Sequence, residues 1–385
     1  MNTKTNNTQK RLTSLDALRG FNLFFLVALG PILLTFCNGV PNGCLDWVFD
    51  PLSHLLRHEE WEGLTLWDLI MPLFMFMSAA SIPFSMARYK RERQYGDFFK
   101  RLLRRVALLW LLGAIIQGNL RSLDPEHIYI FTNTLQSIAV GYAIAAVLYM
   151  FTGWRTQLAC CIGLLLSYWG AMELITIDGF GGGLYGKADN LAELIDRVVL
   201  GRFRDGATVL EDGTVAFAPG YTNTWILSSL TFGATSVFGL LSGTICRSQS
   251  NQRRKLLLLL AAGIVLTIIG WIWNIEMPVI KRIWTSSMVV VAAGYSFLLM
   301  GAFFWFYDCR HYTFGLDFLR TYGLNSLAAY TMEEMINFRS IPQSLFYGLQ
   351  QYIGDFYPCL ITIGQAIVIY LILVAMKRLN IFIKV

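Results

Sequence analysis

The segment LWDLIMPLFMFMSAASIPFSM, residues 66–86, has the length and composition of a membrane-spanning helix, because it carries a single charged residue, Asp68. Directly before it lies RHEEWEGLT, residues 57–65, which is crowded with titratable side chains. His58 stands among these carboxylates, and a histidine in such a setting can exchange a proton near neutral pH. We therefore expect chemistry at this junction, at the edge of a bilayer.

The composition of the whole chain extends this reading. Of 385 residues, 55% are hydrophobic and 15% are charged, whereas soluble domains carry about 25% charged residues. Mean hydropathy is +0.50. These values predict an all-α integral membrane protein, with residues 1–385 forming a single polytopic domain.

Apolar windows of about 20 residues predict about ten transmembrane helices. They lie near residues 18–37, 66–87, 100–118, 133–151, 156–176, 225–245, 255–273, 286–306, 317–336 and 358–378. The first apolar run lacks a cleavage site, so we expect it to remain in the membrane.

An even number of spans puts both termini on one side, and Lys and Arg gather in the loops that fall on that side. The segment 88–105 alone holds eight basic residues. The positive-inside rule therefore predicts cytoplasmic termini. It also accounts for the net charge of +6 without nucleic acid, which we exclude as a partner.

A larger extracytoplasmic loop is expected near residues 177–224, which are rich in Asp and Glu. Residues 190–200 show the apolar spacing of a short helix. The loop is long enough to cap a site, and a flexible surface loop is the equal alternative.

No metal site is expected. The seven cysteines show no metal-type spacing, and His54 and His58, four residues apart, have no evident third ligand. His127 and His311 fall in short loops, where a solvated role is the ordinary interpretation. His58 is left as the candidate catalytic histidine, although it can also serve only to anchor the start of the helix.

Asp68 follows His58 by ten residues, and a carboxylate at this depth is costly unless it faces a partner or a polar cavity. We interpret Asp68 as the group that orients His58. The alternative is a carboxylate that is stabilised by the helix dipole alone.

Other polar residues recur at the ends of the predicted spans, and Asn325 with Ser326 interrupts the ninth. Those assigned to substrate binding are Trp61, Asn133, Gln136, Lys281, Trp284, Ser287 and Asn325. Each can equally be a hydrogen-bonding contact between helices. Glu333, Glu334 and Arg339 form a further polar cluster without an assigned role.

Four residues near the inner ends of the spans are assigned to a phosphate-bearing donor: Asp16, Arg19, Arg104 and Arg105. Arginines there can meet phosphates by charge-assisted hydrogen bonds, but topology alone also accounts for them. Asp16 and Arg19, three residues apart on one helical face, can instead form a structural ion pair.

Four blocks carry a family resemblance: residues 14–21 (SLDALRGF), 58–74 (HEEWEGLTLWDLIMPLF), 283–287 (IWTSS) and 322–326 (YGLNS). In this order they resemble the heparan-α-glucosaminide N-acetyltransferase-like membrane proteins and their bacterial relatives. His58 stands where that family has its proposed catalytic histidine. Departures from the bacterial pattern are Asn22 in place of an aspartate, residues 221–225 in place of an acidic segment, and Met332-Glu333-Glu334 in place of a late His-Glu pair.

The resemblance implies acetyl-CoA as a cytosolic donor and an amino sugar or glycan acceptor on the far side of a bacterial plasma membrane. It adds a lipid environment to the expected partners, and we also consider a homodimer. Our hypothesis is an acyltransferase in which His58 acts as general base, an effect worth about 10²–10⁴ in rate. An acyl-histidine intermediate is an alternative route.

Two other functions are also consistent with the sequence. A carrier would pass a sugar or muropeptide across the membrane unmodified. A catalytically silent relative would assist other envelope proteins.

Overall fold

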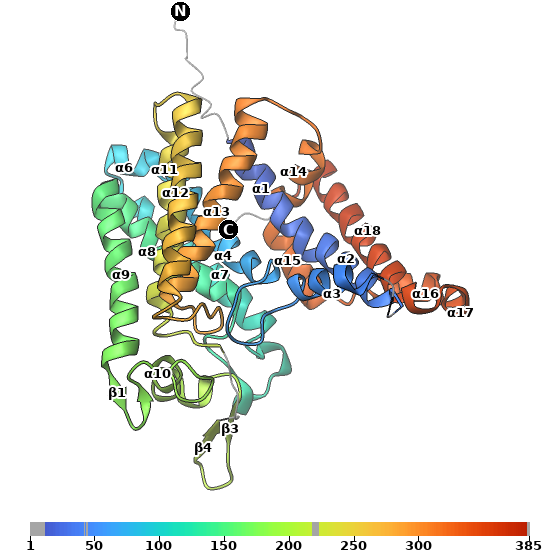
Figure 1. The fold of residues 1–385 in the computed structure, drawn as a ribbon, viewed down its shortest axis with the longest axis horizontal. Coiled ribbons are helices and arrows are strands. Elements are labelled where there is room, and N and C mark those ends of the chain that lie inside the picture. The colour runs from blue at the N-terminus through green and yellow to red at the C-terminus, as the bar shows by residue number, and fades with distance from the viewer. Residues whose placement is uncertain (1–11, 42, 44, 218–222, 383–385) are drawn as a thin grey trace, which may run out of the picture.

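The structure is a computed structural model that describes residues 12–41, 43, 45–217 and 223–382. It confirms the predicted all-α membrane fold (Figure 1). A group of steep helices, including α9, α11, α12 and α13, stands beside a second group in which α1, α2 and α18 run obliquely. Between the two groups lies α4, the helix of the quoted segment.

Among the described residues, nine helices are twelve or more residues long: α1 Thr13–Phe24, α7 Tyr95–Ile116, α8 Thr134–Phe151, α9 Trp154–Leu174, α11 Ser229–Arg247, α12 Gln252–Trp273, α13 Ser286–Phe303, α18 Tyr357–Arg378 and, counted with its first turn η2 Trp67–Leu69, α4 Ile70–Ala80. The shorter α-helices are α2 Gly30–Gly39, α3 Asp46–Leu55, α5 Ile82–Ser85, α6 Ala87–Glu92, α10 Leu191–Leu200, α14 Leu316–Leu324, α15 Ser326–Met335, α16 Ser340–Leu345 and α17 Gln350–Ile353. Wider π-helical turns, η1 Phe25–Leu29 and η6 Phe304–Cys309, continue α1 and α13. Single 3₁₀ turns are η3 Leu120–Ser122, η4 Pro125–His127, η5 Gly201–Phe203, η7 Tyr347–Leu349 and η8 Gly354–Phe356.

A helix occupies each of the ten predicted spans, and eight helices of the described chain are long and apolar enough to cross a membrane. The other two differ for local reasons. Helix α7 begins five residues before the predicted span and carries four basic residues, at 100, 101, 104 and 105. The predicted span 317–336 is two short helices, α14 and α15, separated at Asn325. The total of ten crossings stays a prediction.

Small residues bring α11 against α4. A side-chain carbon at Gly239 would lie 2.0 Å from the carbonyl oxygen of Phe76, and one at Gly243 would lie 2.2 Å from that of Ala80. Glycines four residues apart share one helix face and let two backbones approach closely in lipid. The glycine pair therefore fixes the position of α4.

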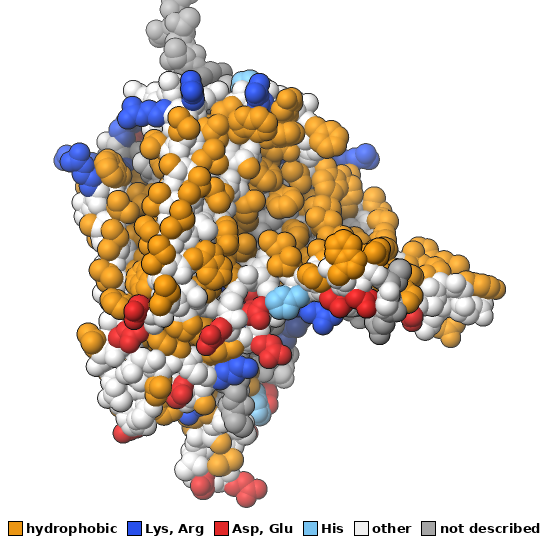
Figure 2. Space-filling view, viewed as in Figure 1, with side chains coloured by type: hydrophobic (Ala, Val, Ile, Leu, Met, Phe, Trp, Pro, Cys, Tyr) orange, Lys and Arg blue, Asp and Glu red, His pale blue; other side chains and the backbone are white. Residues whose placement is uncertain are grey.

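Charge is distributed by side, as Figure 2 shows. Lys and Arg gather at the end where α11 meets α12, whereas Asp and Glu gather beyond the opposite edge of the hydrophobic surface. At the basic end Lys90 donates to the carbonyls of Tyr149 and Thr152, and Arg247 donates to the Tyr149 hydroxyl. The basic loops thus lie together, as the sequence predicts.

The predicted helix in the acidic insert is confirmed as α10, which Asn190 caps by accepting the backbone N–H of Glu193 at 2.8 Å. Two short antiparallel hairpins flank it, β1 Thr176–Ile177 with β2 Phe180–Gly181 and β3 Ala207–Val209 with β4 Val215–Phe217. Asp196 anchors the insert by accepting the backbone N–H groups of Trp225 and Ile226 at 2.8 and 2.9 Å. The described part of the insert is therefore folded onto the helices.

Candidate active site

Two loops that are far apart in the sequence meet at the acidic edge of the membrane region. The backbone N–H of Gly63 donates to the carbonyl of Val279 at 2.8 Å, and Gly63 pairs with Ile280 as an isolated bridge. Gly63 has a φ of +121°, which an L-residue rarely adopts. This pairing places the loop of His58 against the loop between α12 and α13.

His58 and Asp68 are in direct contact, since Nδ1 of the ring lies 2.7 Å from Oδ1 of the carboxylate. The other carboxylate oxygen accepts the backbone N–H of Glu59 at 3.1 Å and the N–H and hydroxyl of Thr65 at 3.3 and 2.9 Å. Asp68 is buried and held by these three donors. An ionised carboxylate only accepts hydrogen bonds, so Nδ1 donates and Nε2 is left as the free basic nitrogen.

Lys281 reaches the same contact from the second loop. Its Nζ lies 3.2 Å from Asp68 Oδ1 and 3.1 Å from His58 Nδ1. Burial lowers the pKa of Lys281, and the charge of Asp68 opposes that shift. Sequence reasoning assigned Lys281 to the substrate, and the structure places it in a three-membered cluster with His58 and Asp68.

His54 does not join this cluster. Helix α3 ends at Leu55, so His54 and His58 are not on one helix, and Nε2 of His54 faces the Glu59 carboxylate at 3.4 Å. In the described part of the chain no three His, Cys, Asp or Glu side chains are grouped as metal ligands would be.

A cavity of about 650 Å³ opens beside His58 and Lys281 and follows one face of α4. From Trp67 to Ser81 the lining residues of this face recur every three or four positions, a distance of about 20 Å at the helical rise. The hydrocarbon core of a bilayer is about 30 Å thick. The cavity therefore follows α4 over a length equal to about two-thirds of that thickness.

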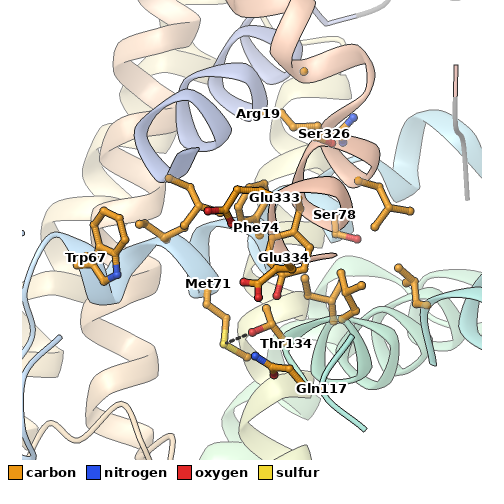
Figure 3. Close-up of a pocket in the computed structure, with 18 of the residues that line it drawn as sticks. Arg19, Trp67, Met71, Phe74, Ser78, Gln117, Thr134, Ser326, Glu333 and Glu334 are labelled. Atoms are coloured by element: carbon orange, nitrogen blue, oxygen red, sulfur yellow. Dashed lines mark hydrogen bonds between the residues drawn. The ribbon is translucent and has the colours of Figure 1, made fainter. Parts of the chain in front are cut away.

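Basic side chains line the far part of this cavity. Arg19 of α1 lies near Ser326, well separated from Trp67 and Gln117 in Figure 3. Arg105 of α7 also lines it, donating to Ser78 Oγ at 3.0 Å with its guanidinium 3.9 Å from the centre of the Tyr142 ring. The Nε of Arg105 is buried without a hydrogen-bond acceptor in the described chain. Arg19 and Arg105 both carry a guanidinium group, which suits an anionic ligand.

Glu333 and Glu334 of α15 are the cavity residues whose role sequence reasoning missed. They lie between Phe74, Met71 and Thr134 (Figure 3). Neither forms an ion pair with a residue that the structure describes. The signal available in the sequence was two adjacent carboxylates inside an apolar span, which is costly unless a cavity or partner receives them.

Asn133 and Gln136 do not line the cavity, and their side chains are committed to structure. Asn133 accepts the N–H of Leu135 at 2.7 Å and donates to Gln117 at 3.0 Å. Gln136 accepts the N–H groups of Thr132 and Asn133 at 2.8 and 3.0 Å. Together they form a capping box at the start of α8.

Four other residues assigned to the substrate also lie outside the cavity lining. Trp61 donates to the Tyr185 carbonyl at 2.8 Å and so joins the His58 loop to the acidic insert. Trp284 donates to Thr235 at 3.1 Å, and Ser287 donates to the Pro278 carbonyl at 3.1 Å. Asn325, between α14 and α15, donates to the Ile381 carbonyl at 3.0 Å.

Only some of the four residues assigned to the donor line the cavity. Arg19 and Arg105 line the cavity, whereas Asp16 and Arg104 do not, and Arg104 is exposed. No described residue of the acidic insert lines the cavity, but the insert adjoins the site through Trp61 and through the bond from the Thr224 N–H to the Arg282 carbonyl at 3.2 Å.

Comparison with known proteins agrees with the blocks seen in the sequence. Residues 11–178 match a family model described as "Domain of unknown function (DUF5009)". Human heparan-alpha-glucosaminide N-acetyltransferase is 26% identical over 376 residues, an alignment that covers 84% of this chain and 53% of the human protein. The mouse protein of the same name is 24% identical over 379 residues, covering 86% of this chain and 54% of its own.

The chain is similar over most of its length to two heparan-alpha-glucosaminide N-acetyltransferases. The resemblance inferred from the sequence is thereby confirmed. This chain spans about half the length of the curated relatives it matches.

Proposed function

We propose that the chain is a membrane acyltransferase that moves an acetyl group from cytosolic acetyl-CoA to a glycan on the opposite side of the membrane. One observation supports this proposal above all: the His58 cluster and Arg105 line the same continuous cavity along α4. The names of the relatives support transfer of an acetyl group to an amino sugar.

In this proposal His58 is the general base. With Nδ1 donating to Asp68, Nε2 accepts a proton from the acceptor amine as its nitrogen attacks the thioester carbonyl carbon. The carbon–sulfur bond then breaks, and His58 returns the proton to the departing thiolate. The products are an N-acetylated glycan and free CoA, so His58 ends the cycle unprotonated.

Asp68 holds the ring in the tautomer that this step needs, because its buried carboxylate accepts the Nδ1 proton. Arg105, with Arg19, would hold the CoA phosphates at the basic end of the cavity, which both side chains line. With the phosphates there, the thioester arm would extend along α4 toward His58. Cytoplasmic termini and a bacterial plasma membrane are part of this proposal.

The test is release of free thiol from acetyl-CoA by the purified protein with a panel of amino sugars, for wild type and His58→Ala. We expect turnover by the wild type and a loss of about 10²-fold or more in the variant. His127→Ala is the matched control, because Nδ1 of His127 also lies 2.7 Å from a carboxylate, that of Asp124, but outside the cavity.

Absence of turnover with every acceptor, together with saturable sugar uptake into vesicles that hold the protein, would contradict the proposal and indicate a carrier. Equal turnover by His58→Ala and wild type would remove His58 from the mechanism. Silence in both assays would leave only an accessory role.

A further inference from the structure

We propose that Lys281 is a positioning residue for the reaction, whose positive charge balances the negative charge of Asp68 while the imidazole of His58 is unprotonated. This inference rests on the proposed function. It replaces substrate binding as the role of Lys281.

Lys281, Asp68 and His58 lie within hydrogen-bonding distance of one another. Lys281 Nζ, Asp68 Oδ1 and His58 Nδ1 form a triangle with sides of 3.2, 2.7 and 3.1 Å. The shortest side requires a proton between Nδ1 and Oδ1, since a nitrogen lone pair would repel a carboxylate at that distance. The ammonium of Lys281 therefore donates to the carboxylate and lies beside the ring without donating to Nδ1, which carries a proton.

The net charge of this cluster depends on whether the imidazole is protonated. An ammonium and a carboxylate cancel while the ring is neutral, and a proton added at Nε2 brings a second positive charge close to Lys281. Lys281 thus favours the unprotonated ring that a general base requires. Without Lys281, the Asp68 carboxylate alone would face the ring and would stabilise the imidazolium.

Other charged side chains also lie near the ring of His58. On the His58 loop, Glu59 is engaged by His54 at 3.4 Å, and Arg57 bonds the side chain of Asn38 at 2.8 Å. Across the cavity stand Glu333 and Glu334. All of these remain when Lys281 alone is changed.

Backbone hydrogen bonds hold Lys281 in place. Lys281 follows directly on Ile280, the residue that pairs with Gly63 in the His58 loop. The carbonyl of Lys281 also accepts the N–H of Trp284 at 3.0 Å, which closes a tight turn. The ammonium is consequently held by a short, bonded segment, as a positioning group must be.

The experiment compares kcat/KM between pH 5.5 and 9 for wild type, Lys281→Met and Lys281→Arg, with acetyl-CoA and the best amino sugar. We expect the acid limb of the Lys281→Met profile to move to higher pH by about one unit, the effect of a unit charge about 3 Å away even at the dielectric constant of water. The rate at pH 9 should stay within several-fold of wild type. Lys281→Arg keeps the charge and should keep the acid limb.

Two outcomes would overturn the inference while leaving the proposed function intact. A raised KM for the sugar with an unmoved limb would return Lys281 to substrate binding. A uniform loss of rate at every pH, or an acid limb that also moves in Lys281→Arg, would make it a structural support.

A second readout does not depend on turnover. Diethyl pyrocarbonate modifies unprotonated imidazole, and its rate at His58 can be followed by mass spectrometry in protein whose other histidines, at 54, 127 and 311, are glutamine. The midpoint of the pH dependence should rise by about one unit in Lys281→Met. An unchanged midpoint would refute the inference even if the wild type proved inactive.

Discussion

The guanidinium of Arg105 lies 3.9 Å from the centre of the Tyr142 ring while one of its nitrogens donates to Ser78. Cation–π contact with a buried tyrosine holds an arginine in place without neutralising it. Arg105 is therefore presented to the cavity as a fixed positive charge about ten residues along α4 from Asp68.

This arrangement predicts that Arg105→Ala raises the KM for acetyl-CoA about 10-fold or more, because a hydrogen bond to a charged group is worth about 1.5–3 kcal/mol. S-acetylpantetheine, which lacks the phosphates, should show the same KM in both proteins. Arg101→Ala is the control, since Arg101 also stands over a tyrosine, Tyr89, but outside the cavity. Equal KM values for acetyl-CoA in wild type and Arg105→Ala would contradict the phosphate role.

A second prediction concerns the tautomer of His58. Asp68→Asn should lower kcat by about 10²-fold or more with little change in KM, because an amide does not hold the Nδ1 proton as a carboxylate does. Asp124→Asn, at the exposed His127 pair, should leave kcat unchanged. A wild-type kcat in Asp68→Asn would show that the contact does not serve catalysis.

A third prediction concerns pH and the acidic insert. Burial raises the pKa of Asp196 to about 7, against the backbone N–H groups of Ile226 and Trp225 and the charge of Arg204. The folded pKa lies above the unfolded value of 3.8, so the stabilisation is complete at low pH and is lost as pH rises through 7. Amide exchange in α10 should accelerate between about pH 4 and 7 beyond its intrinsic pH dependence, and the excess should level off above pH 7. Asp196→Asn should abolish this excess, and an unaltered excess in the variant would assign it to another group.

The fourth prediction tests the contact of α11 with α4. Gly239→Ala places a carbon 2.0 Å from the Phe76 carbonyl oxygen, so the helices must separate. We expect the free energy of unfolding to fall by about 2 kcal/mol or more, seen as a lower melting temperature in detergent. Gly163→Ala in α9 meets no atom within 4 Å and should melt like the wild type. Equal melting of Gly239→Ala would mean that the contact is loosely packed.

The helices could be predicted from the sequence because an apolar run of sufficient length is a local signal. The break at Asn325 was visible as two polar residues, but its cause is distant. The Asn325 side chain bonds the carbonyl of Ile381, after the last helix, and no local pattern predicts that contact.

The contacts of the candidate site were likewise predictable from the sequence only in part. His58 and Asp68 lie ten residues apart in one segment, so their contact could be expected from the sequence. Lys281 joins them from 223 positions away, through pairing that depends on how two loops fold together. Glu333 and Glu334 were visible as charges, but which face of α15 meets the cavity is settled only by packing.

The bond between Gly63 and Val279 has a consequence for biosynthesis. During translation the loop of His58 is complete long before ribosomes reach the segment that supplies Lys281, so the first half of the polypeptide carries an unfinished centre. In the proposed mechanism, catalysis therefore becomes possible only when the later helices have been inserted. Two fragments divided within the acidic insert should each be inert, and coexpression should restore them as a pair.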